Sequence, residues 1–343
     1  MPRSQLLFLC FLLSVWLPAQ DVEQVLDRVG NLREQSLSIT GGLHLGTDSY
    51  AAAGIAPRRD AFQWNARANL TLGFLGISVP FSFAFADANQ NFNLPSYSFA
   101  GISPTYRWLT VHAGDRSLAL SRFTLDGLTF RGGGLELKPG KWRLAGFYGG
   151  LNRALVNDLN AVGNLNGFYQ RNGWGGKLGY EGERGSLNLI LFSATDDAED
   201  NPLGERNEFV TPLDNKVASI TGRQMIGKRL TVSAEVAHSV TNEDQQAAAI
   251  IATELSPANE LFGLFRPNQS VVTGQAYHFD AFYNLEKTGL QAGYERVTRG
   301  FRTLGALFFN NDSERITAGL NRSLLNNKLS LSANGGLASP PLA

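Results

Sequence analysis

Hydrophobic and polar residues alternate along most of the chain. In residues 64–74 apolar side chains occupy the even positions, and Asn65, Arg67 and Asn69 fall between them; residues 77–86 show the same alternation. Residues two apart share one face of a β-strand, so each segment predicts a strand with one apolar and one polar or small face. The pattern recurs in residues 230–240, 275–285, 290–296, 316–320 and 329–335.

The whole chain predicts fifteen strands. Each is about ten residues long, which is the length of a tilted membrane strand. A soluble β-sandwich would alternate in the same way, with its apolar faces turned inward. The polar faces, however, hold Gly, Ser, Asn, Thr and scattered charge, as a water-filled lumen requires. The predicted strands cover residues 36–47, 62–74, 77–86, 105–114, 117–125, 128–138, 142–152, 173–182, 186–195, 214–224, 229–241, 272–286, 289–300, 313–323 and 328–338.

The connections between the predicted strands are sorted by length. Those after even-numbered strands are all short, and those after odd-numbered strands are mostly long. The exception is Asp126-Gly127, a tight hairpin signal after the fifth strand. Short periplasmic turns facing long outer loops are typical of outer-membrane barrels, and a sandwich has no reason to sort its loops. The sequence therefore predicts an all-β, antiparallel up-and-down transmembrane β-barrel of about 14–16 strands.

The odd strand count has a consequence. Fifteen strands that start in the periplasm would leave the end of the chain outside, whereas single-chain bacterial barrels have even numbers and both ends inside. Residues 335–343 carry no terminal aromatic residue. Either the strand count is off by one, or residues 36–343 are the N-terminal part of a longer barrel, which is the interpretation that we favour. The segments 36–47 and 328–338 should then be unpaired sheet edges.

The N-terminus predicts export. Residues 1–19 combine Arg3, an apolar run and a small residue at Ala19, which is the pattern of a cleaved signal peptide. The apolar run is shorter than the roughly 20 residues of a membrane anchor. Residues 20–35 have apolar side chains at intervals of three and four, which predicts a short periplasmic helix. No other stretch is long and apolar enough for a helical membrane span.

Composition narrows the function classes. Thirty Lys and Arg balance thirty Asp and Glu, which argues against a nucleic-acid partner, because that affinity depends on an excess of basic residues. Charged residues make up 17%, below the roughly 25% of soluble domains. One Cys and four His leave little material for disulfides, thiolate metal sites or haem, so no cofactor is expected.

Four segments resemble a known group of proteins: APRRD from Ala56, ISVPFSF from Ile77, GISPTYRWLTVHAG from Gly101 and RGGGLELKPGKWRLAGFYGGLNRA from Arg131. They are similar to the start of large outer-membrane β-barrel proteins of Bacteroidota, a group without an assigned biochemical role. The resemblance covers about residues 36–155. It implies a barrel fold and an outer-membrane location, and it supplies no functional residues.

Catalytic and metal motifs are weak in this sequence. Residues 132–134 are three glycines without the Lys-Ser/Thr and following helix of a phosphate loop, so a deformed strand is the better interpretation. His44, His238 and His278 have no ligand spacing, and no Ser–His–Asp arrangement is legible, so we expect neither a zinc site nor an enzyme. His112 lies on a polar face and is either a lumen residue or a structural one.

Two predicted outer loops are candidate binding sites, one for a metal ion and one for a protein partner. Asp196, Asp197, Glu199 and Asp200 could offer oxygens to calcium, but they lack the order of an EF-hand, and a solvated loop is favoured over a metal site. The loop 242–271 contains an apolar stretch that predicts either a contact surface for a surface partner or a cover over the mouth of the barrel itself.

The predicted function is an outer-membrane channel or transporter for small polar solutes, with lipid as its surroundings and the N-terminus in the periplasm. This rests on analogy of fold. The alternative is a non-conducting scaffold whose long outer loops dock surface or export-machinery partners. A cluster of basic residues in the first half of the chain predicts a weak preference for anions. The predicted pore-lining residues are Asn65, Arg67, Asn69, Arg107, His112, Arg131, Glu136, Lys138, Arg143 and Glu235.

Overall fold

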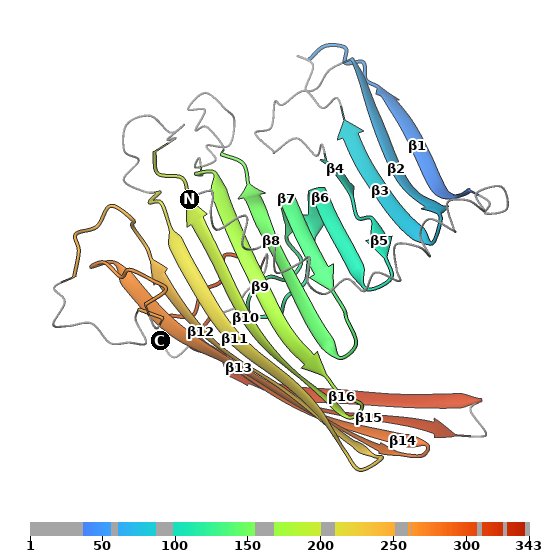
Figure 1. Ribbon diagram of the computed structural model, residues 1–343, viewed down its shortest axis with the longest axis vertical. Helices are drawn as coiled ribbons and strands as arrows, with labels where there is room; N and C mark the ends of the chain where they lie inside the picture. The colour runs from blue at the N-terminus through green and yellow to red at the C-terminus, as the bar shows by residue number, and fades with distance from the viewer. Residues whose placement is uncertain are drawn as a thin grey trace, which may run out of the picture.

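The chain forms a single antiparallel β-sheet in a computed structural model (Figure 1). The structure describes residues 37–55, 61–86, 99–154, 168–199, 210–250, 260–261, 263–306, 311–324 and 328–339. The predicted signal peptide, 1–19, and the predicted helix, 20–35, lie outside the described residues. Within the described part, no helix is long and apolar enough to cross a membrane.

Sixteen strands follow one another in sequence and in space. All strand pairs are antiparallel, and β4 and β5 together fill one position between β3 and β6. This confirms the predicted all-β, up-and-down fold. The strands are β1 (Ser38–Ser49), β2 (Phe62–Phe74), β3 (Ile77–Ala86), β4 (Phe99–Ile102), β5 (Thr105–Tyr106), β6 (Leu109–Ser117), β7 (Thr129–Leu137), β8 (Trp142–Asn152), β9 (Arg171–Glu181), β10 (Gly185–Asp196), β11 (Asp214–Ile226), β12 (Leu230–Asn242), β13 (Val271–Leu285), β14 (Thr288–Val297), β15 (Ser313–Leu324) and β16 (Leu329–Ser339).

Two of the predicted strands, 105–114 and 117–125, are wrong. Residues 105–106 end one strand, a turn follows at Arg107-Trp108, and β6 then runs on to Ser117. Residues 118–128 are a long connection rather than a strand and a hairpin. With this correction the exception at Asp126-Gly127 disappears, and short and long connections alternate through the described sheet.

The physical reason lies in two backbone conformations. Arg107 adopts a left-handed conformation with φ 51°, which sequence patterns reserve for glycine and asparagine, so no turn was signalled there. Gly114 has φ 86°, yet it lies inside β6, whereas the sequence pattern predicts that a strand ends there. The apolar alternation after Ser117 reflects side chains that pack on the sheet, not a strand.

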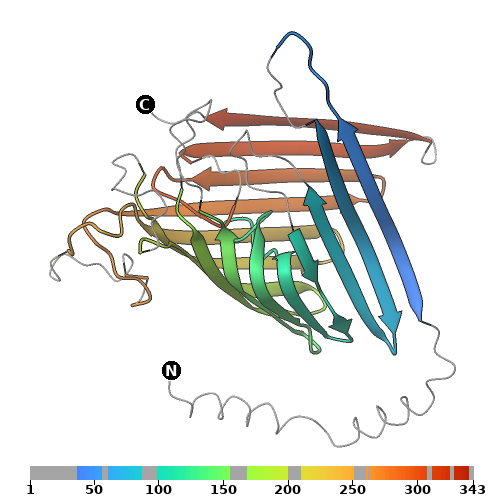
Figure 2. The same ribbon diagram turned by 90° about the horizontal axis from the view of Figure 1, so that it is seen from above.

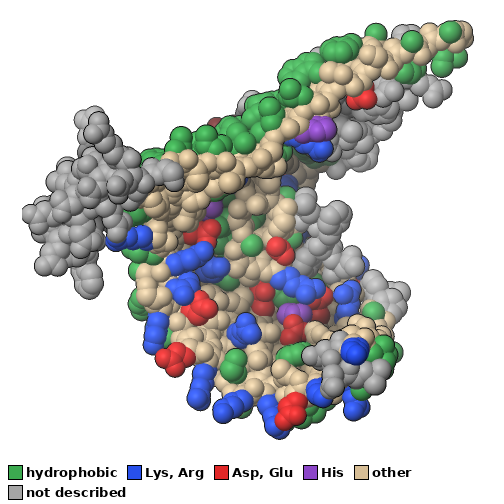
Figure 3. Space-filling view, turned by 90° about the vertical axis from the view of Figure 1, so that its right-hand side faces the viewer, with side chains coloured by type: hydrophobic (Ala, Val, Ile, Leu, Met, Phe, Trp, Pro, Cys, Tyr) green, Lys and Arg blue, Asp and Glu red, His purple; other side chains and the backbone are tan. Residues whose placement is uncertain are grey.

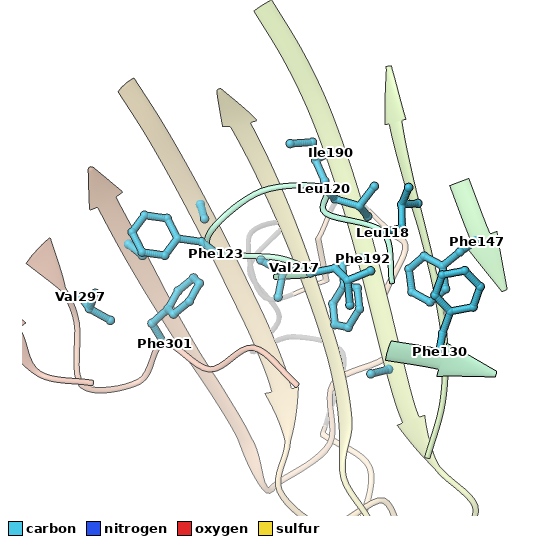
Figure 4. Close-up of a cluster of buried hydrophobic side chains, with 14 residues drawn as sticks. Leu118, Leu120, Phe123, Phe130, Phe147, Ile190, Phe192, Val217, Val297 and Phe301 are labelled. Atoms are coloured by element: carbon cyan, nitrogen blue, oxygen red, sulfur yellow. The ribbon is translucent and has the colours of Figure 1, made fainter. Parts of the chain in front are cut away.

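Two connections fold over one face of the sheet. Residues 118–128 and 298–306, which we call the insert, pack against the strands from β8 to β14 (Figure 4). Leu120, Phe123 and Phe301 supply its apolar side chains, which are buried against Phe192 and Val217. The sheet face that contacts the insert is called the inner face, and the opposite one the outer face.

Cross-strand pairing assigns side chains to these two faces. Glu235 pairs with Thr221 and His278, and it is buried beneath the insert, so it marks the inner face. Its neighbour Val236 lies on the outer face with 43% exposure, and its partner Ile220 with 54%. Figure 3 agrees with this assignment along the upper part of the molecule: hydrophobic side chains gather on its upper margin, and charged side chains lie on the hollowed side beneath it.

Glycines allow the insert to approach the sheet closely. A Cβ on Gly175 would press on Leu120 and Phe147, and a Cβ on Gly305 would collide with the Thr124 carbonyl oxygen and the Phe192 ring. The positions therefore need a residue without a side chain.

The sheet does not close on itself within the described residues. β1 pairs only with β2, and β16 only with β15. In both ribbon views β16 runs across the direction of β1 (Figures 1 and 2). The predicted unpaired edges, 36–47 and 328–338, are thus confirmed for the described part of the chain.

Replacing Gly305 by valine should loosen the insert. The added side chain meets backbone that cannot move aside, so we expect a loss of about 1–3 kcal/mol in the free energy of unfolding. Urea titration of the protein in detergent measures this. The control is Gly335→Val, because a Cβ on Gly335 meets no atom within 4 Å. Equal stability of the two variants would contradict the close packing of the insert.

Candidate functional site

The first half of the insert is fixed to the inner face by a buried carboxylate. Glu235, 7% exposed, accepts hydrogen bonds from the Phe123 backbone N–H at 3.3 Å and from Ser219 Oγ at 2.8 Å. Hydrogen bonds to a charged acceptor inside a protein are stronger than neutral ones. The carboxylate therefore holds the backbone of the insert at a fixed height over β11 and β12.

The second half of the insert is held by an amide. Asn215, which is fully buried, donates to the carbonyl oxygen of Arg302 at 3.0 Å and accepts from the N–H of Leu304 at 3.1 Å. The Arg302 N–H in turn donates to Ser239 Oγ at 3.1 Å. The Asn215 side chain thus makes the backbone hydrogen bonds that a neighbouring strand would otherwise make with this loop.

The two halves of the insert also bind each other. Thr303 Oγ1 donates to the Thr124 carbonyl at 2.7 Å, and the Asp126 N–H donates to the Gly305 carbonyl at 3.0 Å. The Phe123 and Phe301 rings meet edge to face with centroids 5.8 Å apart, a favourable aromatic geometry (Figure 4). The insert is therefore one interlocked body rather than two separate loops.

A charged cluster lies where the insert meets β13 and β14. Arg122 of the insert pairs with Glu295 at 2.6 Å, and His278 lies between Glu295 at 3.3 Å and Asp280 at 2.6 Å. Together with Arg315 these residues line a cavity of about 240 Å³. Both signs of charge are present, so the cavity can offer partners to either end of a dipolar solute.

A second polar group lies on the inner face of β6 and β7. His112 is buried and its ring nitrogens contact Ser103 Oγ at 2.9 Å and Glu136 Oε1 at 3.1 Å. Lys138 Nζ lies 3.1 Å from the other oxygen of Glu136. Of the two roles predicted for His112, the contacts favour the structural one, because both ring nitrogens already have partners.

Most of the predicted pore-lining residues share the inner face. Cross-strand pairs continue from His112 and Gly134 through Phe147 to Phe192 and Val217 beneath the insert. A role in a pore remains a prediction for these residues. The members that lie on this face are Asn65, Arg67, Asn69, His112, Glu136, Lys138, Arg143 and Glu235.

Arg107 and Arg131 lie elsewhere, contrary to the sequence-based assignment. Arg107 occupies the turn between β5 and β6, with its guanidinium 5.2 Å from the Tyr106 ring. Arg131 lies on the outer face and forms two hydrogen bonds of 2.7 Å with Asp115. Arg143 faces inward but pairs with Glu181 at 2.7 Å. The basic ring on which the predicted anion preference rested is therefore not assembled.

Sequence reasoning missed the residues of the charged cluster. The sequence pattern places Arg122 within the predicted strand 117–125, and His278 shows no metal-ligand spacing. Asp280 lies on β13 and Glu295 on β14, fifteen positions later in the sequence, and only the register, which pairs His278 with Glu295, brings them together. The polar positions among apolar neighbours in residues 275–296 carried the usable signal.

The acidic segment after β10 is used within the chain. Asp196 forms an ion pair with Arg171 at 2.7 Å and accepts the Leu213 N–H at 3.0 Å. Asp197 accepts the N–H of Glu199 at 3.2 Å, and Asp200 lies outside the described residues. In the described ranges, no group of three His, Cys, Asp or Glu residues could hold a metal ion.

The described parts of the loop 242–271 pack on the chain itself. Leu261 and Phe265, 3% and 2% exposed, are buried against Val240 on the outer face. Lys216 lies 5.0 Å above the Phe265 ring. These apolar residues therefore cover the chain's own sheet, on its outer side rather than at a mouth, and residues 251–259 are outside the described part.

No protein-family model matches the sequence, and no curated protein matches it. Solved structures with a similar arrangement include OccAB1 of Acinetobacter baumannii, at 13% identity over 84% of this chain and 75% of that one, with a TM-score of 0.38. OccK8 (OprE) of Pseudomonas aeruginosa is 11% identical over 85% of this chain and 80% of that one, with a TM-score of 0.42. A porin is 10% identical over 90% of this chain and 96% of that one, with a TM-score of 0.41. Similarity this low assigns no residue or activity to this chain.

Replacing Glu235 by alanine should release the first half of the insert. The Phe123 N–H would lose its acceptor inside the protein, so we expect a loss of about 1–3 kcal/mol in the free energy of unfolding. Faster proteolytic cleavage within residues 118–128 should accompany it. Glu181→Ala is the control, because an exposed ion pair contributes only about 0–1 kcal/mol. An uncleaved, fully stable Glu235→Ala protein would show that the carboxylate is not the anchor.

Proposed function

We propose that the protein is an outer-membrane channel for small polar solutes, narrowed by the insert. The observation that carries the proposal is the contrast between the two faces of the sheet. The inner face holds charged and amide side chains around the insert. The outer face carries mostly exposed apolar side chains, apart from charged residues such as Arg131, Lys216 and Arg296 towards the long connections. A water-filled bore inside an apolar belt is the arrangement of a transmembrane channel.

Exposed aromatic residues support the membrane location. On β2, Trp64 and Phe74 lie near opposite ends of a strand of 13 residues, and both are more than two-fifths exposed on the outer face. At about 3.3 Å per residue and a tilt of about 40°, such a strand spans roughly 30 Å, which fits the hydrocarbon region and its interfaces. Trp142 and Tyr180 form a further aromatic pair beside the short turns. Aromatic girdles at both interfaces are a feature of membrane barrels.

The insert supports a small solute rather than a large one. It fills the inner side of β10 to β14 with apolar side chains that are fixed by buried hydrogen bonds. The remaining polar surface lies beside Arg122 and along the inner face of the first strands. A rigid constriction of mixed charge favours dipolar solutes over simple anions.

A non-conducting scaffold is the second candidate, and the insert is the observation that favours it. Interlocked loops packed on an apolar inner wall could close the bore instead of narrowing it. In that case the long connections would carry the function by docking partners. Conductance separates the two candidates.

The finer assignments are part of this proposal. An export signal in residues 1–19 and a periplasmic N-terminus follow from the sequence and agree with short turns on the periplasmic side. A relationship to the Bacteroidota barrels rests on the segments quoted from residues 56–154. A channel role requires no catalytic residues and no cofactor.

A charge on the outer face should be costly if that face meets lipid. Val236→Arg should make folding into vesicles less favourable by about 2–4 kcal/mol. The matched control is Ser233→Arg, three residues away on the inner face, which should fold nearly as well as the wild type. Refolding titrations into lipid vesicles measure both, and equal effects would exclude the assigned facing.

Removing Arg122 should change conduction. Arg122→Ala takes a positive side chain from the constriction and leaves Glu295 and Asp280 facing the bore, so single-channel conductance should rise and selectivity should shift toward cations. Planar-bilayer recordings under a salt gradient measure both quantities. Arg296→Ala, on the outer face of the same strand as Glu295, should leave them unchanged. Absence of any conductance in the wild type would reject the channel and leave the scaffold.

A further inference from the structure

Charge is distributed unevenly between the two ends of the strands. The seven short connections, 75–76, 107–108, 138–141, 182–184, 227–229, 286–287 and 325–328, together contain eight Lys and Arg against two Glu. The long connections at the other end contain more Asp and Glu than Lys and Arg. A chain with no net charge therefore has one strongly basic rim.

The basic side chains of this rim are exposed. Lys141, Lys228, Arg229 and Lys287 all lie in hairpin turns and are open to solvent. Figure 3 shows Lys and Arg side chains along the lower margin, the end at which Figure 1 shows the hairpins of β8 to β13.

Six of the eight are also free of partners within the described part of the chain. Lys138 pairs with Glu136, and Arg107 lies over an aromatic ring. The other six make no side-chain hydrogen bond or ion pair to a described residue; they are Lys141, Arg184, Lys228, Arg229, Lys287 and Lys328. Three of the basic residues at the opposite end, Arg171, Arg302 and Lys216, are paired with carboxylates.

Aromatic residues fix the height of the rim relative to a membrane. Trp108 and Trp142 are about half exposed; Trp108 lies within the turn 107–108, and Trp142 directly follows the turn 138–141. Amphipathic aromatic rings of this kind lie at the level of lipid headgroups. The six cations extend just beyond that level, where headgroup phosphates are within their reach.

We propose that this rim binds anionic phospholipid headgroups of the leaflet on the short-turn side. The inference rests on the proposed membrane location but not on conduction. Each cation near an anionic surface contributes roughly a fivefold gain in affinity at low salt. Six unpaired cations spread over successive hairpins match a row of lipid phosphates better than a single compact ligand. The rim would thus select anionic lipids as its annulus and orient the barrel in the bilayer.

The chain provides its own reporters for a test. In a Trp64→Phe, Trp174→Phe background, the mature chain keeps Trp108 and Trp142, both beside the rim. The mature chain, which lacks Trp16, is reconstituted into vesicles of phosphatidylcholine with brominated phosphatidylglycerol, or with brominated phosphatidylcholine as the comparison. Bromine quenches only the tryptophans that its lipid contacts, so the ratio of the two quenching curves gives the relative affinity for the anionic lipid.

We expect the anionic lipid to be preferred about three- to tenfold at low ionic strength, and the preference to fall toward one in high salt. The variant Lys141→Gln, Arg184→Gln, Lys228→Gln, Lys287→Gln should abolish it. A control with four neutralised cations near the other end, Arg153→Gln, Arg266→Gln, Arg296→Gln and Arg299→Gln, should retain it. The complementary protein with Trp108→Phe and Trp142→Phe, which reports from Trp64 and Trp174, should show no preference.

Equal quenching by both lipids in the unmodified rim would overturn the inference and leave the proposed channel intact. Unchanged preference in the four-turn variant would overturn it as well. Absence of quenching by either lipid would instead mean that the strands do not meet lipid, and the proposed function would fail with it.

Discussion

The inner face of the sheet cannot be left exposed to water, and much of the architecture follows from that constraint. Ile190, Phe192 and Val217 form an apolar strip on the side of the sheet where a channel would carry water. The insert covers the strip, and glycines in the strands and in the loop allow it to approach closely. The buried polar anchors Glu235 and Asn215 exist because the backbone of a covering loop has no strand partner.

The fold was largely legible in the sequence because both of its signals are local. A period of two assigns faces to each strand without knowledge of its neighbours, and the alternation of short and long connections orders the strands. The wrong strand predictions lie where the same local pattern can arise from two different structures. Leu118 and Leu120 alternate like a strand because they pack on one, and Arg107 turns the chain without the glycine that usually marks such a turn.

The candidate site was less predictable, because register rather than pattern creates it. His278, Glu295 and Arg122 come from two strands and a distant loop, and their meeting depends on pairings that no single segment specifies. Arg131 is a residue that the sequence wrongly assigned to the site. Its charge suggested the bore, yet in β7 the alternation places it outward, beside Asp115. Charge alone does not tell a lumen residue from an interfacial one when both ends of a strand are polar.

The contact between Phe123 and Phe301 joins segments that are separated by most of the sheet in sequence. Residues 118–128 come early in the sequence, but their partner loop and the walls that hold it, β11 to β14, come much later. Until those strands are laid down, the early loop has nothing to rest on. Its docking is therefore a late event of assembly, governed by the slow closure of long-range contacts. An early intermediate would thus have a wider interior than the finished protein.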